Sequence, residues 1–155
     1  MASDELINKN YGEHLQEHLL EQYKLYVETS LDVTSKRLES NKFYLTLSSI
    51  VLGIAGYLTI INQHAVFILL SVMGIIISVV WIQSIASYKE LNAAKFKVIH
   101  ELEQSMPASV FKFEERNYSG KRKGLASTEK WCPIMFIALY SIIIALTVYT
   151  LLSSL

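Results

Sequence analysis

The chain has 155 residues, 52% of them hydrophobic and 18% charged, and its 14 basic and 14 acidic residues cancel to a formal net charge of +0. This length suits a single domain covering residues 1–155. The lone Cys132 excludes an internal disulfide, and we expect no secretory signal peptide because the first 42 residues are polar.

All the charged residues lie in two blocks, Met1–Lys42 and Ser87–Lys130, and the stretches between and after them carry none. Each charge-free stretch approaches or exceeds the roughly 20 apolar residues that cross a bilayer's hydrocarbon core. A soluble helical bundle of this size has too little interior to bury three such helices. We therefore predict an all-α membrane protein with three transmembrane helices, at residues 43–61, 65–86 and 131–153.

The first charged block predicts a cytoplasmic amphipathic helix over residues 13–42, because no glycine or proline interrupts Glu13–Leu52 and the helix can run on into the first span. Its apolar residues form two adjacent stripes. The first consists of Val27, Leu31, Thr34, Leu38, Asn41 and Leu45, and the second of Leu19, Tyr23, Tyr26, Ser30 and Val33. Two stripes predict a helix that contacts more than one neighbour.

The second span also continues without a turn signal, into "SYKELNAAKFKVIHELEQSMP". We predict that residues 87–106 extend this helix into the cytoplasm and that Pro107 ends it. Folding at Asn62–Gln63 then makes the first two helices a long antiparallel hairpin.

A fold at this turn predicts that residues whose numbers sum to about 127 lie level with each other. Asp32 then faces Lys95, and Arg37 faces Glu90, as two inter-helix ion pairs. Exposed pairs of this kind contribute only about 0–1 kcal/mol each, so they would set the register more than the stability.

Small and weakly polar residues recur at helical spacing in the spans and allow two interpretations. The members are Thr46, Ser49, Gly53 and Gly56 in the first span, Ser71, Gly74 and Ser78 in the second, and Ala138, Ser141 and Ala145 in the third. They can permit close helix packing or face a water-filled pore. We favour packing, because no span contains the ionisable group typical of transporters and proton relays.

Residues 107–130 form a basic cytoplasmic loop. Its first part, "VFKFEERNYS", has a periodicity that does not decide between helix and strand. Its second part holds Lys121, Arg122 and Lys123 between two glycines. These cations can rest on anionic lipid headgroups, which attract about 1 kcal/mol per basic residue, or contact a phosphorylated ligand.

The distribution of basic residues also predicts the orientation. Both charged blocks, with five and nine Lys and Arg residues, should remain on the cytoplasmic side. The N-terminus is then cytoplasmic and the C-terminus outside, and Trp81 and Trp131 fall near the inner membrane–water interface.

No residue pattern indicates catalysis or a cofactor. His14 and His18 lie one turn apart near Glu17 and Glu21, a spacing that can bind a metal but is common on solvated helices. Cys132 has no adjacent histidine or second cysteine. We expect no enzyme, no metal, no cofactor and no nucleic-acid partner.

Several segments of the chain resemble the RipA family of octameric bacterial inner-membrane proteins. They are "YKLYVETSLDVTSKRLESNKFYLTLSS" at Tyr23–Ser49, "SYKELNAAKFKVIHELEQSMP" and "FKFEE" at Phe111–Glu115. More distantly, the layout is similar to the SLATT group of pore-forming defence effectors. The resemblance implies a homo-oligomer, a ring of eight, with no enzymatic activity. Leu38 departs from the pattern, where a second basic residue beside Arg37 is expected.

Our hypothesis is a non-enzymatic, homo-oligomeric protein of the bacterial inner membrane, in contact with itself and with membrane lipids. Its cytoplasmic helical layer would mediate assembly or bind a ligand or partner that the sequence does not identify. A pore-forming effector gated from the cytoplasmic side and an envelope scaffold for a membrane enzyme are the alternatives.

Overall fold

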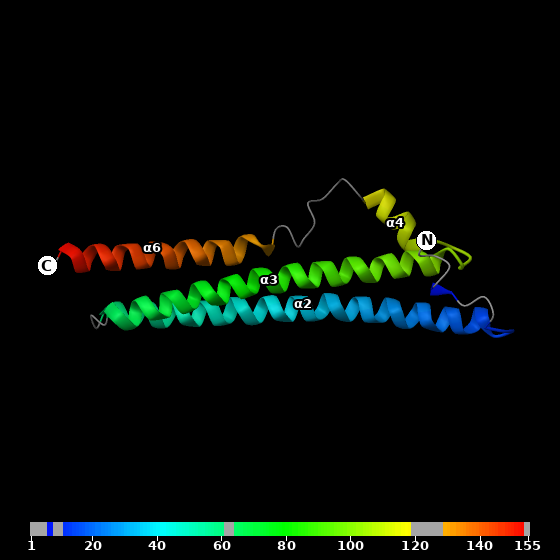
Figure 1. Cartoon of the computed structure of the whole chain (residues 1–155), viewed down its shortest axis with the longest axis horizontal. Coiled ribbons are helices and arrows are strands. Elements are labelled where there is room, and N and C mark those ends of the chain that lie inside the picture. Colours follow the sequence, from blue (N-terminus) through cyan, green and yellow to red (C-terminus); the bar gives the residue numbers. More distant parts are fainter. Residues whose placement is uncertain (1–5, 8–10, 61–63, 119–128, 154–155) are drawn as a thin grey trace. The chain divides into compact units, whose positions relative to one another are not determined.

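A computed structural model describes residues 6–7, 11–60, 64–118 and 129–153, which contain helices and no strand. The element order is α2 (Leu15–Ile60), α3 (His64–Glu103), α4 (Val110–Tyr118) and α6 (Trp131–Ser153). Figure 1 labels these helices along the chain. The expectation of an all-helical chain is confirmed for the described residues.

Two of these helices, α3 and α6, are long and apolar enough to cross a membrane. α2 also includes the charge-free residues from Phe43 to Ile60. α2 and α3 begin and end within three residues of the bounds predicted from the absence of breakers. α3 ends at Glu103, three residues before the predicted end, and 3₁₀-type bonds such as Met106 N to Glu103 O (3.2 Å) close its last turn.

The chain divides into two compact units, and each is described by itself. Unit 1 comprises Met1–Lys36 and Tyr88–Lys123. Its core contains Leu19, Ile99 and Leu102. α4 packs here through Phe111, whose ring lies 6.5 Å from that of Tyr23 and 6.0 Å from that of Phe96. The segment that periodicity left open between helix and strand is therefore a helix.

Unit 2 comprises Arg37–Ser87 and Gly124–Leu155, and combines parts of α2 and α3 with α6. Trp81 and Ile85 form the centre of its hydrophobic core, with Tyr44 and Phe136 packed against them. Tyr140 on α6 is fully buried.

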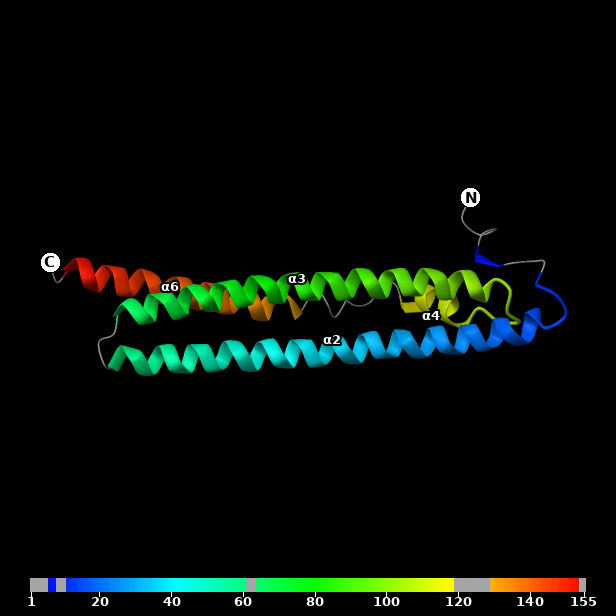
Figure 2. The same cartoon turned by 60° about the horizontal axis from the view of Figure 1, so that its bottom comes forward.

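Within each unit, α2 and α3 lie side by side and antiparallel, as Figures 1 and 2 also show. Unit 1 joins them by the hydrogen bonds Tyr23–Glu103 and Thr29–Lys95, and unit 2 by Ser40–Ser84 and Asn41–Trp81. The numbers in these pairs sum to between 122 and 126, so the observed register falls one to five residues short of the predicted 127.

Candidate functional site

In unit 1 the carboxylate of Glu103, at the end of α3, holds the start of α4. Glu103 is 1% exposed, and its Oε1 and Oε2 accept hydrogen bonds from the backbone amides of Phe111 (2.7 Å) and Lys112 (3.1 Å). First-turn amides have no partner within their own helix. The hydroxyl of Ser109 donates to the Glu103 carbonyl oxygen (3.4 Å). A buried negative charge thus meets the positive end of a helix, which stabilises both.

Tyr23 on α2 completes this contact. Its hydroxyl donates to Oε1 of Glu103 over 3.3 Å. Burial raises the pKa of the Tyr23 phenol, and the charge and hydrogen bond of Glu103 raise it further. The phenol therefore remains a neutral donor at neutral pH. Three elements, α2, α3 and α4, meet at this one carboxylate.

The half-buried Lys95 on α3 has partners other than the predicted Asp32. Its Nζ donates to Thr29 Oγ1 over 2.9 Å and lies 4.8 Å from the centroid of the Tyr26 ring. Asp32 is exposed, and no ion pair joins it to Lys95. The cause is the register, because Thr29 lies one turn before Asp32 on α2. A cation–π contact and a hydroxyl replace the expected ion pair.

Arg37 also has a different partner from the one predicted. Its guanidinium forms an ion pair of 3.6 Å with Glu129, beside the start of α6, whereas Glu90 is exposed on α3. The Arg37 and Glu129 side chains are only 13% and 16% exposed. Arg37 Nε and Glu129 Oε2 are buried without a hydrogen-bond partner. Breaking such a pair costs more than its formation gains, because it strands a poorly solvated charge.

In the same unit, Trp81 lies at the centre of the hydrophobic core. Its Nε1 donates to Asn41 Oδ1 over 2.8 Å, and its ring stacks on Tyr44 with 16° between the planes. Phe136 on α6 lies 6.3 Å from the Trp81 ring. A buried indole N–H needs an acceptor, and Asn41 supplies it within unit 2.

The small residues of the first two spans fall into two classes. Ser71 and Ser78 are fully buried and donate to carbonyl oxygens of their own helix. Gly74 is also buried, and a Cβ there would overlap the ring of Tyr140, whose hydroxyl donates to Ser48 O over 2.8 Å. The first-span members are exposed: Thr46, Ser49, Gly53 and Gly56.

The structure adds little evidence for the remaining candidate ligand, metal and thiol sites. Lys121, Arg122 and Lys123 lie outside the described residues. His14 lies 3.4 Å from Glu17 with both side chains exposed, and His18 bonds Tyr11. Within the described residues, no three His, Cys, Asp or Glu side chains gather as a metal site would require. Cys132 is exposed.

A family model described as the octameric membrane protein family (8xMP) matches residues 20–150. The chain belongs to this family. The resemblance to octameric membrane proteins is thereby confirmed. No curated protein and no solved structure matches the chain. The match to this octameric membrane protein family includes both units except for residues 1–19 and 151–155.

For this member of the octameric membrane protein family, sequence reasoning missed the buried contacts of Glu103, Tyr140 and Glu129. Glu103 lies among many charged residues, so its type alone is not informative. A signal was nevertheless present, because α4 follows a proline turn and needs an acceptor for its first amides. Tyr140 and Gly74 are far apart in sequence, and no periodicity links them.

Proposed function

We propose that the chain is a non-enzymatic subunit of a homo-oligomeric ring of eight in the bacterial inner membrane. Unit 1 would form a cytoplasmic helical layer that mediates assembly and presents a surface to a cytoplasmic ligand or partner. Membership of an octameric membrane protein family supports self-assembly.

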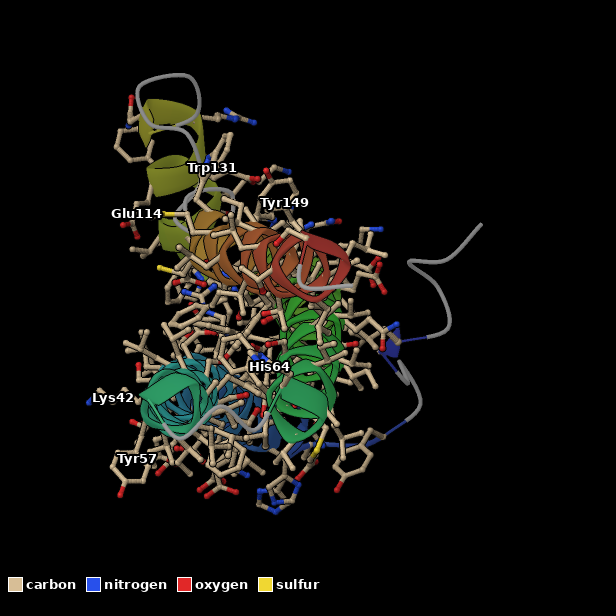
Figure 3. The ribbon with its side chains drawn as sticks, turned by 90° about the vertical axis from the view of Figure 1, so that its left-hand side faces the viewer. Lys42, Tyr57, His64, Glu114, Trp131 and Tyr149 are labelled. Atoms are coloured by element: carbon tan, nitrogen blue, oxygen red, sulfur yellow. The ribbon has the colours of Figure 1, made fainter. Side chains whose placement is uncertain are left out.

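Three spans are part of this proposal. α3 and α6 supply two of them, and the charge-free part of α2 supplies the third. Figure 3 shows the side chain of Tyr57 directed away from the neighbouring helices, and 64% of it is exposed. Trp131, at the start of α6, is 65% exposed, as suits an indole at a membrane–water interface.

The observation that carries the proposal is the exposed apolar surface of unit 1. This unit holds most of the charged residues, yet Leu31, Val110 and Phe113 are each at least 60% exposed. Lipid would not cover side chains interspersed with so many charges. Large exposed apolar groups in water mark protein–protein contacts, and copies of the same chain are the partner that the family supplies.

Subunit counting tests this function. The purified chain in nanodiscs should give a mass of eight subunits by native mass spectrometry, and a monomer would contradict the proposal. For orientation, a cysteine at the exposed Lys97 of a Cys132→Ser variant should react with an impermeant maleimide only after cells are opened. Labelling of intact cells would reverse the topology.

A gated pore is a second candidate, and the exposed Thr46, Ser49, Gly53 and Gly56 favour it. An uncovered face of small residues can border an axis as well as a neighbouring helix. Planar-bilayer recordings test this idea. We expect conductance that Gly53→Leu reduces, and a ring that never conducts defeats the pore without affecting the octamer.

A further inference from the structure

The two apolar stripes of α2 differ in solvent exposure. In one stripe, Leu19, Ser30 and Val33 are at most 9% exposed, and Tyr23 and Tyr26 are half-buried. In the other stripe, Val27, Thr34 and Asn41 are half-buried, whereas the leucines are exposed, with Leu31 67% exposed. Helical periodicity adds Leu20, which is 43% exposed, and the half-buried Val27 to the same side. We call Leu20, Val27 and Leu31 the outer leucine face.

Exposed leucines recur along α2. Leu38 and Leu45 follow Leu31 at intervals of seven residues on α2, and each is 45% exposed. A seven-residue repeat of leucines is the spacing by which one helix packs lengthwise against another.

On α3, unit 1 presents a second uncharged face. It consists of Leu91, Ala94 and Val98, spaced three and four residues apart. Leu91 is 47% exposed, Ala94 is exposed and Val98 is half-buried. The small Ala94 between two larger side chains leaves room for a knob from another helix.

The two faces lie at the same level. The Tyr23–Glu103 and Thr29–Lys95 bonds place Leu31 opposite the segment that contains Leu91 and Ala94. Copies that share one orientation in a membrane are related by rotation about the membrane normal. Residues at the same height in one copy therefore lie at the same height in its neighbours. Such a rotation gives head-to-tail contacts, in which one surface meets a different surface of the next subunit.

We propose that the outer leucine face of each subunit packs on Leu91, Ala94 and Val98 of the neighbouring copy. This inference rests on the proposed octamer and names its contact. Lipid is not the occupant, because the exposed charges of Lys24, Glu28 and Asp32 border the leucines on α2. A second copy brings an uncharged face at the matching level.

Photocrosslinking tests which surface covers Leu31. With p-benzoylphenylalanine at position 31, the octamer in nanodiscs should give a ladder of covalent multimers after irradiation. Peptide mapping should place the crosslinks at residues 91–98 of the neighbour. Crosslinks to lipid alone, or to α2 of the neighbour, would overturn the proposal. The same probe at the exposed Lys36, on the charged side of α2, serves as the control.

Two leucines of α2 provide a matched pair of substitutions. Leu31→Lys places a charge in the contact and should raise the subunit dissociation constant by at least about tenfold. Leu25→Lys changes a leucine that is 61% exposed but lies on the charged side of the helix, and it should leave the octamer intact. Both positions are solvent-exposed within the subunit, so neither change should unfold it.

The outcomes separate the two proposals. If the unmodified chain is an octamer and Leu31→Lys leaves it so, the contact is overturned and the proposed function stands. If the unmodified chain is a monomer in nanodiscs, both fail.

Discussion

Unit 1 and unit 2 each pack an additional helix against α2 and α3, and they do so by different physical means. In unit 1 the carboxylate of Glu103 binds the first amides of α4. In unit 2 the ring of Tyr140 fills the space above Gly74 and its hydroxyl reaches Ser48 O. Charge holds α4 at its first turn, whereas shape holds α6 along its length and the Arg37–Glu129 ion pair lies beside its start.

The difference follows the distribution of charge along the chain. A buried carboxylate is tolerated where amides at a helix start can solvate it, as in unit 1. The apolar helices of unit 2 offer no such compensation, so close packing and one neutral hydrogen bond replace it. Four variants, each with a matched control, test how the helices are held, in order of decreasing expected effect.

Filling the space above Gly74 should be the most damaging change. Gly74→Ala places a methyl group on the Tyr140 ring, and we expect a loss of about 3 kcal/mol or more in the free energy of unfolding because the core has no room. Thermal unfolding in detergent micelles, followed by tryptophan fluorescence, measures it.

Gly53→Ala is the matched control, since nothing lies within 4 Å of a Cβ at Gly53. It should be neutral or slightly stabilising. Tyr140→Leu should rescue Gly74→Ala in part. Equal effects of the two glycine changes would show that shape does not hold α6.

Removing the carboxylate of Glu103 should cost about 2–3 kcal/mol, because two amides and the Tyr23 hydroxyl lose their acceptor. Glu103→Ala should therefore speed amide hydrogen exchange throughout α4. Glu114→Ala, at an exposed position of the same helix (Figure 3), should not change the exchange. Unchanged exchange in Glu103→Ala would mean that α4 is held by its apolar contacts alone.

Alkaline pH should weaken unit 1 through Tyr23. Its pKa is raised above the ordinary value of 10.0, so the neutral phenol stabilises the fold fully below pH 10. This contribution should be lost as the pH rises through the raised pKa. Difference absorbance at 295 nm would follow the phenolate.

Tyr23→Phe should abolish that component of the alkaline loss and cost about 1 kcal/mol at neutral pH, the value of one hydrogen bond. Tyr57→Phe, at an exposed position, should do neither. An unchanged alkaline profile in Tyr23→Phe would assign the loss to another group.

The smallest expected effect concerns Lys95. Thr29→Val removes its hydroxyl partner and should cost about 1 kcal/mol. Asp32→Asn removes a charge that is exposed and has no ion pair with Lys95, and it should change stability by less than about 0.5 kcal/mol. Chemical denaturation would measure the loss of stability in both variants. A larger loss for Asp32→Asn than for Thr29→Val would support the predicted Asp32–Lys95 ion pair.

The sequence predicted the features that depend only on the residues of a single helix. Unbroken Glu13–Leu52 predicted α2, whereas the contact of its two stripes with more than one neighbour stays a prediction. The partner of Lys95 was not predictable, because an error of three residues in the α2–α3 register exchanges one helical turn for the next. Glu129 and Tyr140 contact other helices only through tertiary structure, and no periodicity reports such contacts.

The exposed Ser49 gives its hydroxyl hydrogen to Leu45 O over 2.8 Å. Only its oxygen lone pairs remain for whatever approaches this side of α2. A neighbouring helix would suit it best with a donor such as an amide or a second hydroxyl, and an aqueous column along it would favour potassium or sodium over chloride.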